Sequence, residues 1–216
     1  IDILVYITLI SFINIALTGL RWYFVAQYYR ANISIIDSIH IYAVSRLLGL
    51  VFPQSGNVYR ATVLKRKYNI NLSNYLEILF GYTWLTVLVT FTIGECILFI
   101  SGAKVSLLGL DGRILLLILI VSISFGPFLL STILRLHINN CGISGSFARI
   151  SKSYTEGIHK MLFARKLLFS FIFLSCLSFS LLYFQLALGF SNIGAQPKAE
   201  ALVLLTALLK LGSIMN

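Results

Sequence analysis

The sequence predicts an all-α, polytopic membrane protein, and three observations lead to this fold class. First, 58% of the 216 residues are hydrophobic and 11% are charged, with a mean hydropathy of +0.92; soluble domains have roughly 45–50% apolar and about 25% charged residues. Second, the chain contains long runs without any charge. Third, a polar break at residues 52–60 interrupts the apolar pattern, where backbone groups exposed to lipid would lack hydrogen-bond partners.

Charge-free runs predict four membrane spans. A helix needs about 20 apolar residues to cross roughly 30 Å of hydrocarbon, and the runs long enough for this lie at Ile3 to Leu20, Ile78 to Gly94, Ile114 to Leu134 and Leu167 to Pro197. The spans are therefore expected at about 3–29, 74–101, 113–136 and 166–190.

A further membrane element is expected at 199–216, which is apolar except for Glu200 and Lys210. Its length is close to the lower limit for spanning, so it either crosses or forms one limb of a second re-entrant unit. We expect a chain truncated at both ends. An apolar run starts at Ile1 without a basic leader, and a helical pattern continues to Asn216 without a stop signal.

Basic residues predict the topology. They concentrate between the first two spans and between the last two, whereas the remaining connections hold few. Loops rich in Lys and Arg face the cytoplasm, so both basic regions are expected there. The first region contains Arg21, Arg30, Arg60, Lys65, Arg66 and Lys67.

A re-entrant element is predicted at 33–57, followed by a basic helix at 58–68. A full crossing would place Arg21 on the side opposite Lys65, against the positive-inside rule. Asp37, His40 and Arg46 also make a lipid-facing span unfavourable. An ordinary helix pair with a turn on the far side is the alternative.

An interfacial amphipathic helix is predicted at 146–165. Its apolar residues, including Tyr154 and Ile158, fall on one helical face, and basic residues such as Lys160 fall on the other. The basic face is expected to contact anionic head groups or to be a solvated connector. A cluster of Trp22, Tyr23, Tyr28 and Tyr29 follows the first span and indicates an interfacial aromatic belt.

Candidate lipid-binding or anion-binding residues lie at the break. If Asn57 caps the next helix, the first-turn amides point toward the break, and Arg60 and Lys67 share one helical face. Gly56, Asn57 and Arg60 would then form a phosphate-sized site. Arg46 either joins it or pairs with Glu77 or Glu95. For the lysines and Arg66, a role as a positive topological anchor is an equal alternative.

Glu95 is a possible intramembrane acid, because carboxylates within spans are commonly functional. It also lies near the end of its span, where it can reach water. No catalytic constellation and no metal-ligand spacing is found in the sequence, so we expect no enzyme activity, metal or cofactor. The basic charge follows the membrane topology, and no nucleic-acid partner is expected.

Two segments resemble the lysylphosphatidylglycerol synthase transmembrane family, which is flippase-like. They are Asn14 to Trp22, which ends in Arg21-Trp22, and Phe52 to Ala61, which matches a Pro-x-x-Gly-Gly-(Asp/Glu)-x-x-Arg-like motif. Where that motif has a second Gly and an acidic residue, this chain has Gly56 followed by Asn57, and the arginine is retained as Arg60. The family also has a second Pro-Gly motif, and Asn216 falls about where that motif would begin.

The resemblance implies a multi-pass protein of the prokaryotic cytoplasmic membrane that moves or positions phospholipid or lipid-linked head groups. The expected partners are membrane lipids, either anionic phospholipid or lipid-linked phosphate. The alternative is the membrane part of a lipid-modifying glycosyl- or aminoacyl-transferase, with the transferase as a partner domain outside these residues. A purely structural membrane anchor is a third possibility.

Overall fold

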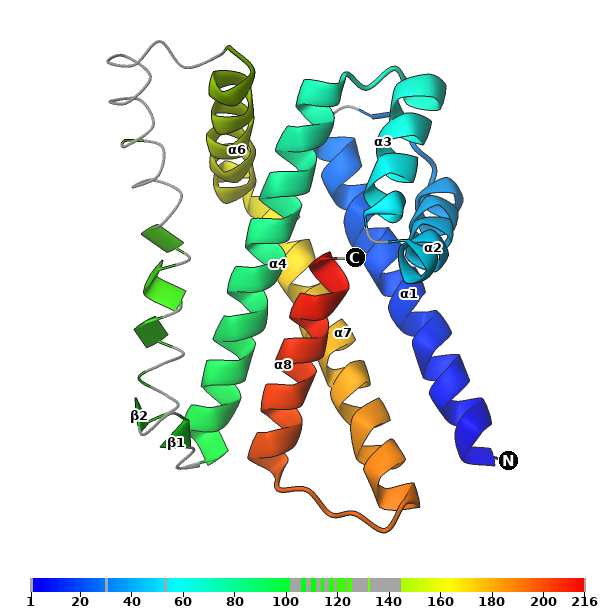
Figure 1. Ribbon diagram of the computed structural model, residues 1–216, viewed down its shortest axis with the longest axis vertical. Coiled ribbons are helices and arrows are strands. Elements are labelled where there is room, and N and C mark those ends of the chain that lie inside the picture. The colour runs from blue at the N-terminus through cyan, green and yellow to red at the C-terminus, as the bar shows by residue number, and fades with distance from the viewer. Residues whose placement is uncertain are drawn as a thin grey trace.

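The protein is an α-helical bundle built from long and short helices (Figure 1). The computed structural model describes residues 2–29, 31–52, 54–101, 106–107, 110–111, 114, 117–118, 120–122, 124–125, 132 and 145–215. Within these residues the elements are α1 (Asp2–Tyr28), α2 (Ile35–Val51), α3 (Ser55–Tyr68), α4 (Leu72–Ser101), α6 (Gly145–Phe163), α7 (Arg165–Asn192), α8 (Ala199–Met215), and the short antiparallel strands β1 (Ser106–Leu107) and β2 (Leu110–Asp111).

Three of these helices are long and apolar enough to cross a membrane, at Ile3–Tyr28, Leu72–Ile100 and Arg165–Asn192. With a rise of about 1.5 Å per residue each extends roughly 40 Å, more than the hydrocarbon core requires. The prediction of an all-α polytopic membrane protein is therefore confirmed. The span predicted at 113–136 lies largely outside the described residues.

Helices α2 and α3, which follow α1 and precede α4 in the chain, form a hairpin. The end of α1 and the start of α4 lie at the same end of the molecule, and α2 leads away from this end while α3 returns to it (Figure 1). The two helices contain 17 and 14 residues, or about 26 and 21 Å, which is less than a full crossing. The hairpin therefore reaches only part of the way along the bundle.

The break between α2 and α3 is shorter than the sequence predicts. α2 ends at Val51, and α3 already begins at Ser55 instead of residue 58. Gln54 makes the turn with a positive φ of 67°, a backbone conformation that few residues other than glycine adopt. Its left-handed conformation reverses the chain within very few residues.

The open ends of the hairpin are tied together by Asp37. Lys67 Nζ donates to the Asp37 carboxylate at 3.0 Å, and the Tyr68 hydroxyl donates to it at 2.8 Å. Ser34 caps α2, accepting a hydrogen bond from the Asp37 amide at 3.0 Å. Lys67 is thus bonded to α2 and does not converge with Arg60, because the two lie about 10 Å apart along α3.

Helix α2 crosses α1 at very close range. A Cβ atom on Gly19 would lie 2.6 Å from the Ile39 Cα, so only glycine allows the two backbones to approach this closely. Ser38 Oγ donates to the Gly19 carbonyl at 2.9 Å across the same crossing. The position of α2, and of every side chain on it, therefore depends on this contact.

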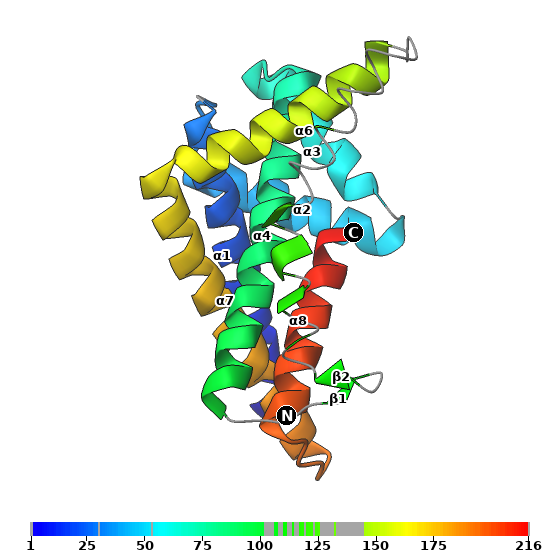
Figure 2. The ribbon, with the colours of Figure 1, turned by 90° about the vertical axis from the view of Figure 1, so that its left-hand side faces the viewer.

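Helix α6 lies across α4 at the end of the bundle where the hairpin opens (Figure 2). Gly157 and Gly81 allow the approach: a Cβ on Gly157 would lie 2.3 Å from the Glu77 carbonyl oxygen. Ile158 and Met161 are fully buried there. The ammonium of Lys160 forms an ion pair with Glu77, whose side chain is 7% exposed, while the Lys160 side chain remains 43% exposed; the predicted contact of this helix with lipid head groups stays a prediction.

Helix α8 approaches the hairpin from the opposite end of the bundle. It starts beyond α7 and ends at mid-height near the α2–α3 turn (Figures 1 and 2). Its buried residues Val203 and Ala207 pack with Leu98 and Phe179. The hairpin and α8 thus extend into the bundle from opposite ends, and the candidate site lies in the space between them.

Candidate functional site

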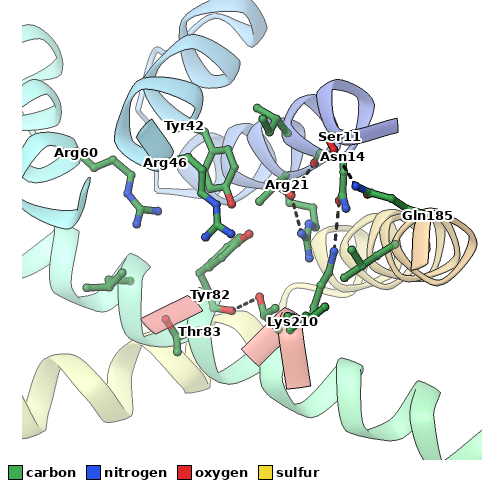
Figure 3. A pocket seen from close by; sticks show the side chains of 16 residues that line it. Ser11, Asn14, Arg21, Tyr42, Arg46, Arg60, Tyr82, Thr83, Gln185 and Lys210 are labelled. Atoms are coloured by element: carbon green, nitrogen blue, oxygen red, sulfur yellow. Dashed lines mark hydrogen bonds between the residues drawn. The ribbon is translucent and has the colours of Figure 1, made fainter. Parts of the chain in front are cut away.

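A cavity of about 330 Å³ opens between the hairpin, α8 and the long helices. Its size lies within the range of small-molecule sites. Side chains from α1, α2, α3, α4, α7 and α8 line it (Figure 3). Four described lining residues are cationic, namely Arg21, Arg46, Arg60 and Lys210, and eight are uncharged polar residues: Ser11, Asn14, Thr18, Tyr42, Tyr82, Thr83, Thr86 and Gln185.

Arg60 is held in a defined orientation by α3 and by aromatic rings. Its side chain is only 8% exposed, and its guanidinium carbon lies 4.8 Å from the Trp22 ring centre and 5.9 Å from that of Tyr42. Arg60 Nη2 donates to Asn57 Oδ1 at 2.5 Å, and Nε lies 3.4 Å from the Gly56 carbonyl oxygen. Gly56, Asn57 and Arg60 lie together, as the sequence predicts. The role of Asn57 differs from the predicted one.

Asn57 is not a helix cap. Gln54 occupies the N-cap position of α3 and makes no side-chain cap bond, so Asn57 is already within the first turn. Its side-chain oxygen accepts from Arg60, and its amide donates to Gln54 Oε1 at 2.8 Å. Tyr75 of α4 donates to the Asn57 carbonyl at 3.0 Å. Asn57 therefore orients Arg60 and joins the hairpin to α4.

Arg46 lies on α2 and also lines the cavity (Figure 3). It is half-buried and follows Tyr42 by one helical turn. The predicted alternative of an Arg46–Glu77 pair is wrong, because Glu77 pairs with Lys160. Arg46 lies among the cations that line the cavity, and both its predicted role in the site and its predicted pairing with Glu95 stay predictions.

Glu95 is not among the described residues that line the cavity. It lies further along α4 than Thr86, the last α4 residue that lines the cavity, by about 13 Å of helix. The candidate intramembrane acid and the candidate anion site are therefore separate features. In the described part of the chain, no three His, Cys, Asp or Glu side chains gather as a metal site.

Arg21 is a cation of the site that the sequence analysis treated only as a topological marker. It is 2% exposed, and it donates to Ser175 Oγ at 3.2 Å and to Thr18 Oγ1 at 3.0 Å. Its guanidinium lies 5.9 Å from the Tyr82 ring centre and 5.6 Å from that of Phe171. Its Nε atom is buried without a hydrogen-bond partner.

Lys210 is the second cation that was missed. It is 6% exposed, and its ammonium donates to Asn14 Oδ1 at 3.4 Å and to Ser178 Oγ. Ser178 also donates to Asn14. This cluster joins α1, α7 and α8 at one side of the cavity.

The sequence contains one pattern that indicates the position of Arg21. Ser11, Asn14, Thr18 and Arg21 recur at the spacing of one helical face, within an otherwise apolar span. A polar stripe in a membrane helix faces the protein interior.

The prediction for Trp22 is wrong. Trp22 is 5% exposed and stacks on Tyr82 at 5.1 Å, so it belongs to the core and not to an interfacial belt.

The cavity is strongly electropositive. The chain has seven acidic residues, and none of them is among the described residues that line the cavity. Buried cations are costly unless an opposite charge accompanies them, and more so within a membrane. Arg forks and uncharged hydrogen-bond donors are well suited to phosphate oxygens. The arrangement is therefore suited to binding an anion.

Fold and cavity together define a polytopic α-helical membrane protein with a cavity lined by cations inside its bundle. The sequence model of the lysylphosphatidylglycerol synthase TM region matches residues 1–215, and the chain belongs to this family. Membership supports a function related to membrane lipids. No curated protein and no solved structure matches the chain.

Proposed function

We propose that this protein moves or positions phospholipid or lipid-linked head groups across the cytoplasmic membrane of a prokaryote, by binding the head-group phosphate in the cationic cavity. The observation that carries the proposal is the set of four cations around one cavity without a described lining carboxylate. Family membership supports the lipid part of the proposal.

The two partial elements suit this task. The hairpin carries Arg46 and Arg60 from one end of the bundle, and α8 carries Lys210 from the other. A head group bound between them lies at mid-height, where it is shielded from the hydrocarbon, while its acyl chains remain in lipid. Small movements of either element would open the cavity toward one end.

The distribution of basic residues indicates how the protein is oriented in the membrane. The hairpin ends in Lys65, Arg66 and Lys67, at the end of the bundle where α6 also lies. Under the positive-inside rule this end faces the cytoplasm. The hairpin would then receive head groups from the cytoplasmic leaflet, and α8 would face the outer one.

The test is lipid translocation in proteoliposomes, measured as the fraction of a head-group-labelled phosphatidylglycerol that becomes accessible to a membrane-impermeant quencher. Arg60→Gln should reduce the rate at least tenfold. The matched control is Arg66→Gln, which removes the same charge from an exposed position of the same helix, and it should leave the rate within twofold of wild type. Equal rates for both variants would reject the proposal.

A second candidate is favoured by the family's description, which names the membrane region of a synthase. In that case the cavity holds a lipid head group and presents it to a transferase domain, with no need for translocation. The same assay separates the two. The second candidate expects head-group binding that depends on Arg60, with no protein-dependent translocation.

A further inference from the structure

We infer that two parts of the chain, α1–α2 and α7–α8, form an inverted repeat, and that movement between them opens the cavity to the two ends of the bundle in turn. The gates that close these ends are the contact of Arg21 with Ser175 and the contact of Ser11 with Gln185. The inference rests on the proposed function and names the moving parts of the same site.

The two parts have matching lengths. Helices α1 and α7 contain 27 and 28 residues, and α2 and α8 contain 17 residues each. The connections within the two parts are residues 29–34 and 193–198. An offset of 164 positions, which is the separation of Asn14 and Ser178 in the chain, therefore aligns both helices and the connection of one part with those of the other.

The two parts run in opposite directions. α1 leads to the end of the bundle where the hairpin opens, and α7 leads to the opposite end; α2 and α8 then each return only to mid-height (Figure 1). A two-fold axis across the bundle relates two such parts. Repeats of inverted topology are common in membrane transporters, and their substrate binds between the repeats near the middle of the membrane.

The cavity lies where this axis crosses the bundle. The offset exchanges Asn14 with Ser178, and the two residues are bonded to each other, so their contact is its own equivalent. The same offset relates Arg46 of α2 to Lys210 of α8, and both of these side chains line the cavity. The cavity therefore receives one cation from the short helix of each repeat.

Two further hydrogen bonds between α1 and α7 are reciprocal. Arg21 Nη1 donates to Ser175 Oγ at 3.2 Å, and Gln185 Nε2 donates to Ser11 Oγ at 3.0 Å. The offset converts the first bond into the second, because it places Arg21 on Gln185 and exchanges the two serines. Such reciprocal pairing is the property of an interface with two-fold symmetry.

The reciprocal bonds lie on opposite sides of the central Asn14–Ser178 contact. Because α1 and α7 are antiparallel, the Arg21 bond lies toward the end where the hairpin opens, and the Gln185 bond lies toward the other end. Transporters with inverted repeats rock one repeat against the other around a fixed site. Rocking about the central contact breaks one reciprocal bond while the other persists. The structure contains both bonds and is thus the closed state between two open ones.

The two repeats are not held together internally to the same degree. Gly19 and Ser38 join α1 to α2 through a close backbone approach and a hydrogen bond. The equivalent residues of α7 and α8 are Tyr183 and Leu202. A tyrosine does not allow the same approach, and leucine has no side-chain donor. We therefore expect α1–α2 to move as a rigid unit, whereas α8 can shift against α7.

The test closes the end of the cavity remote from the hairpin with a cleavable cross-link. Ser11→Cys and Gln185→Cys are introduced into a chain whose own three cysteines are replaced by alanine, and a short bis-methanethiosulfonate joins them. The control joins Ser73→Cys to Ser153→Cys, a polar contact of 3.2 Å between α4 and α6, which lies outside both repeats. Translocation of labelled phosphatidylglycerol in proteoliposomes is measured before and after reduction with dithiothreitol.

We expect the far-end cross-link to lower the translocation rate at least tenfold and reduction to restore it, which also shows that the cross-linked protein is folded. The control cross-link should change the rate less than twofold. Binding of dihexanoyl phosphatidic acid, a soluble lipid with a bare phosphate head group, is measured by titration calorimetry. It should differ less than threefold between the cross-linked and the reduced form of the same variant, because the other end still opens. Unchanged translocation after far-end cross-linking would overturn the inference.

A structural readout separates this inference from the proposed function. Spin labels at Val5→Cys on α1 and Ser191→Cys on α7, both exposed beyond the Ser11–Gln185 contact, report the separation of the two helices without any need for transport. We expect two distance populations whose ratio changes when phosphatidic acid is added. A single population that phosphatidic acid leaves unchanged would overturn the inference. Two populations in a protein that translocates no lipid would support the gates and reject the proposed function.

Discussion

The guanidinium carbon of Arg60 lies 4.8 Å from the centre of the Trp22 ring, although the two residues belong to different helices. Trp22 itself stacks with Tyr75 and with Tyr82 of α4. One ring therefore connects the hairpin to α1 and α4. The contact holds the Arg60 side chain at the cavity.

The Arg60–Trp22 contact should be measurable as a coupling energy. Cation–π pairs contribute about 0.5–1 kcal/mol when exposed and about 2 kcal/mol or more when desolvated, and this pair is buried. We expect a double-mutant cycle with Arg60→Gln and Trp22→Leu to give a coupling of about 1–2 kcal/mol in the free energy of unfolding. Additive effects of the two substitutions would show that the ring does not hold Arg60.

Gly157→Ala should strongly destabilise the protein. The added Cβ would lie 2.3 Å from the Glu77 carbonyl oxygen, so α6 and α4 must separate. Overpacking of this kind typically costs about 1–3 kcal/mol, occasionally more. Thermal unfolding in detergent measures the effect.

Gly94→Ala is the control for this prediction, because a Cβ at Gly94 would meet no atom within 4 Å. Alanine is favoured over glycine in a helix by about 0.5–1 kcal/mol, so Gly94→Ala should leave stability unchanged or slightly raised. If both variants unfold at the same temperature, the α4–α6 contact is not as close as the structure has it.

Gly19→Ala tests how the hairpin is positioned. The new Cβ would lie 2.6 Å from the Ile39 Cα and would push α2 away from α1, and Arg46 with it. We expect phosphatidic acid affinity to fall at least tenfold while the protein remains helical by circular dichroism. Gly189→Ala on α7 meets no atom within 4 Å and should bind like wild type. Unchanged binding by Gly19→Ala would mean that the position of α2 is irrelevant to the site.

Lys210→Met should raise the unfolding temperature of the ligand-free protein. Burying an ionised ammonium group is costly unless an opposite charge accompanies it, and Arg21 lines the same cavity. The same variant should lose most of the stabilisation that phosphatidic acid provides. A fall in ligand-free stability would indicate that Lys210 is a structural residue and not part of a binding site.

The pairing of Asp37 should appear in the pH dependence of stability. Hydrogen bonds from Lys67 and Tyr68 hold the pKa of the Asp37 carboxyl below its ordinary value of 3.8. The contribution is therefore complete above pH 3.8 and is lost as the pH falls through the lower, folded-state pKa. Below pH 3.8, the unfolding temperature of wild type should fall more steeply than that of Asp37→Asn, by a small amount because the pair is exposed. Parallel curves would contradict the pairing.

The hairpin could be predicted from the sequence because its determinants are local. Pro53, Gly56 and the basic run after Arg60 indicate a break followed by a basic helix without knowledge of any neighbour. The exact turn could not be predicted, since Gln54 adopts a left-handed conformation that its residue type does not favour.

The cavity depends on contacts between distant segments, and for this reason most of it was missed. Lys210 meets Asn14 and Ser178 only once α8 has packed against α7. Trp22 is an ordinary interfacial residue until α4 places Tyr75 and Tyr82 against it. The pairing of Lys160 with Glu77 could not be predicted, because the two residues lie 83 positions apart in the chain. Local patterns indicate which residues are polar, but not which of them meet.

The most direct test of the central claim is to locate a bound head group by photo-crosslinking. A phosphatidic acid analogue that carries its photoreactive group beside the phosphate is irradiated with the protein in vesicles, and the labelled peptides are identified by mass spectrometry. We predict labelling within residues 42–60 that is lost when excess phosphatidic acid is added and in Arg60→Gln, but not in Arg66→Gln. Labelling confined to lipid-exposed positions such as Leu4 and Phe12, unaffected by competitor, would contradict the assignment of the cavity as a head-group site.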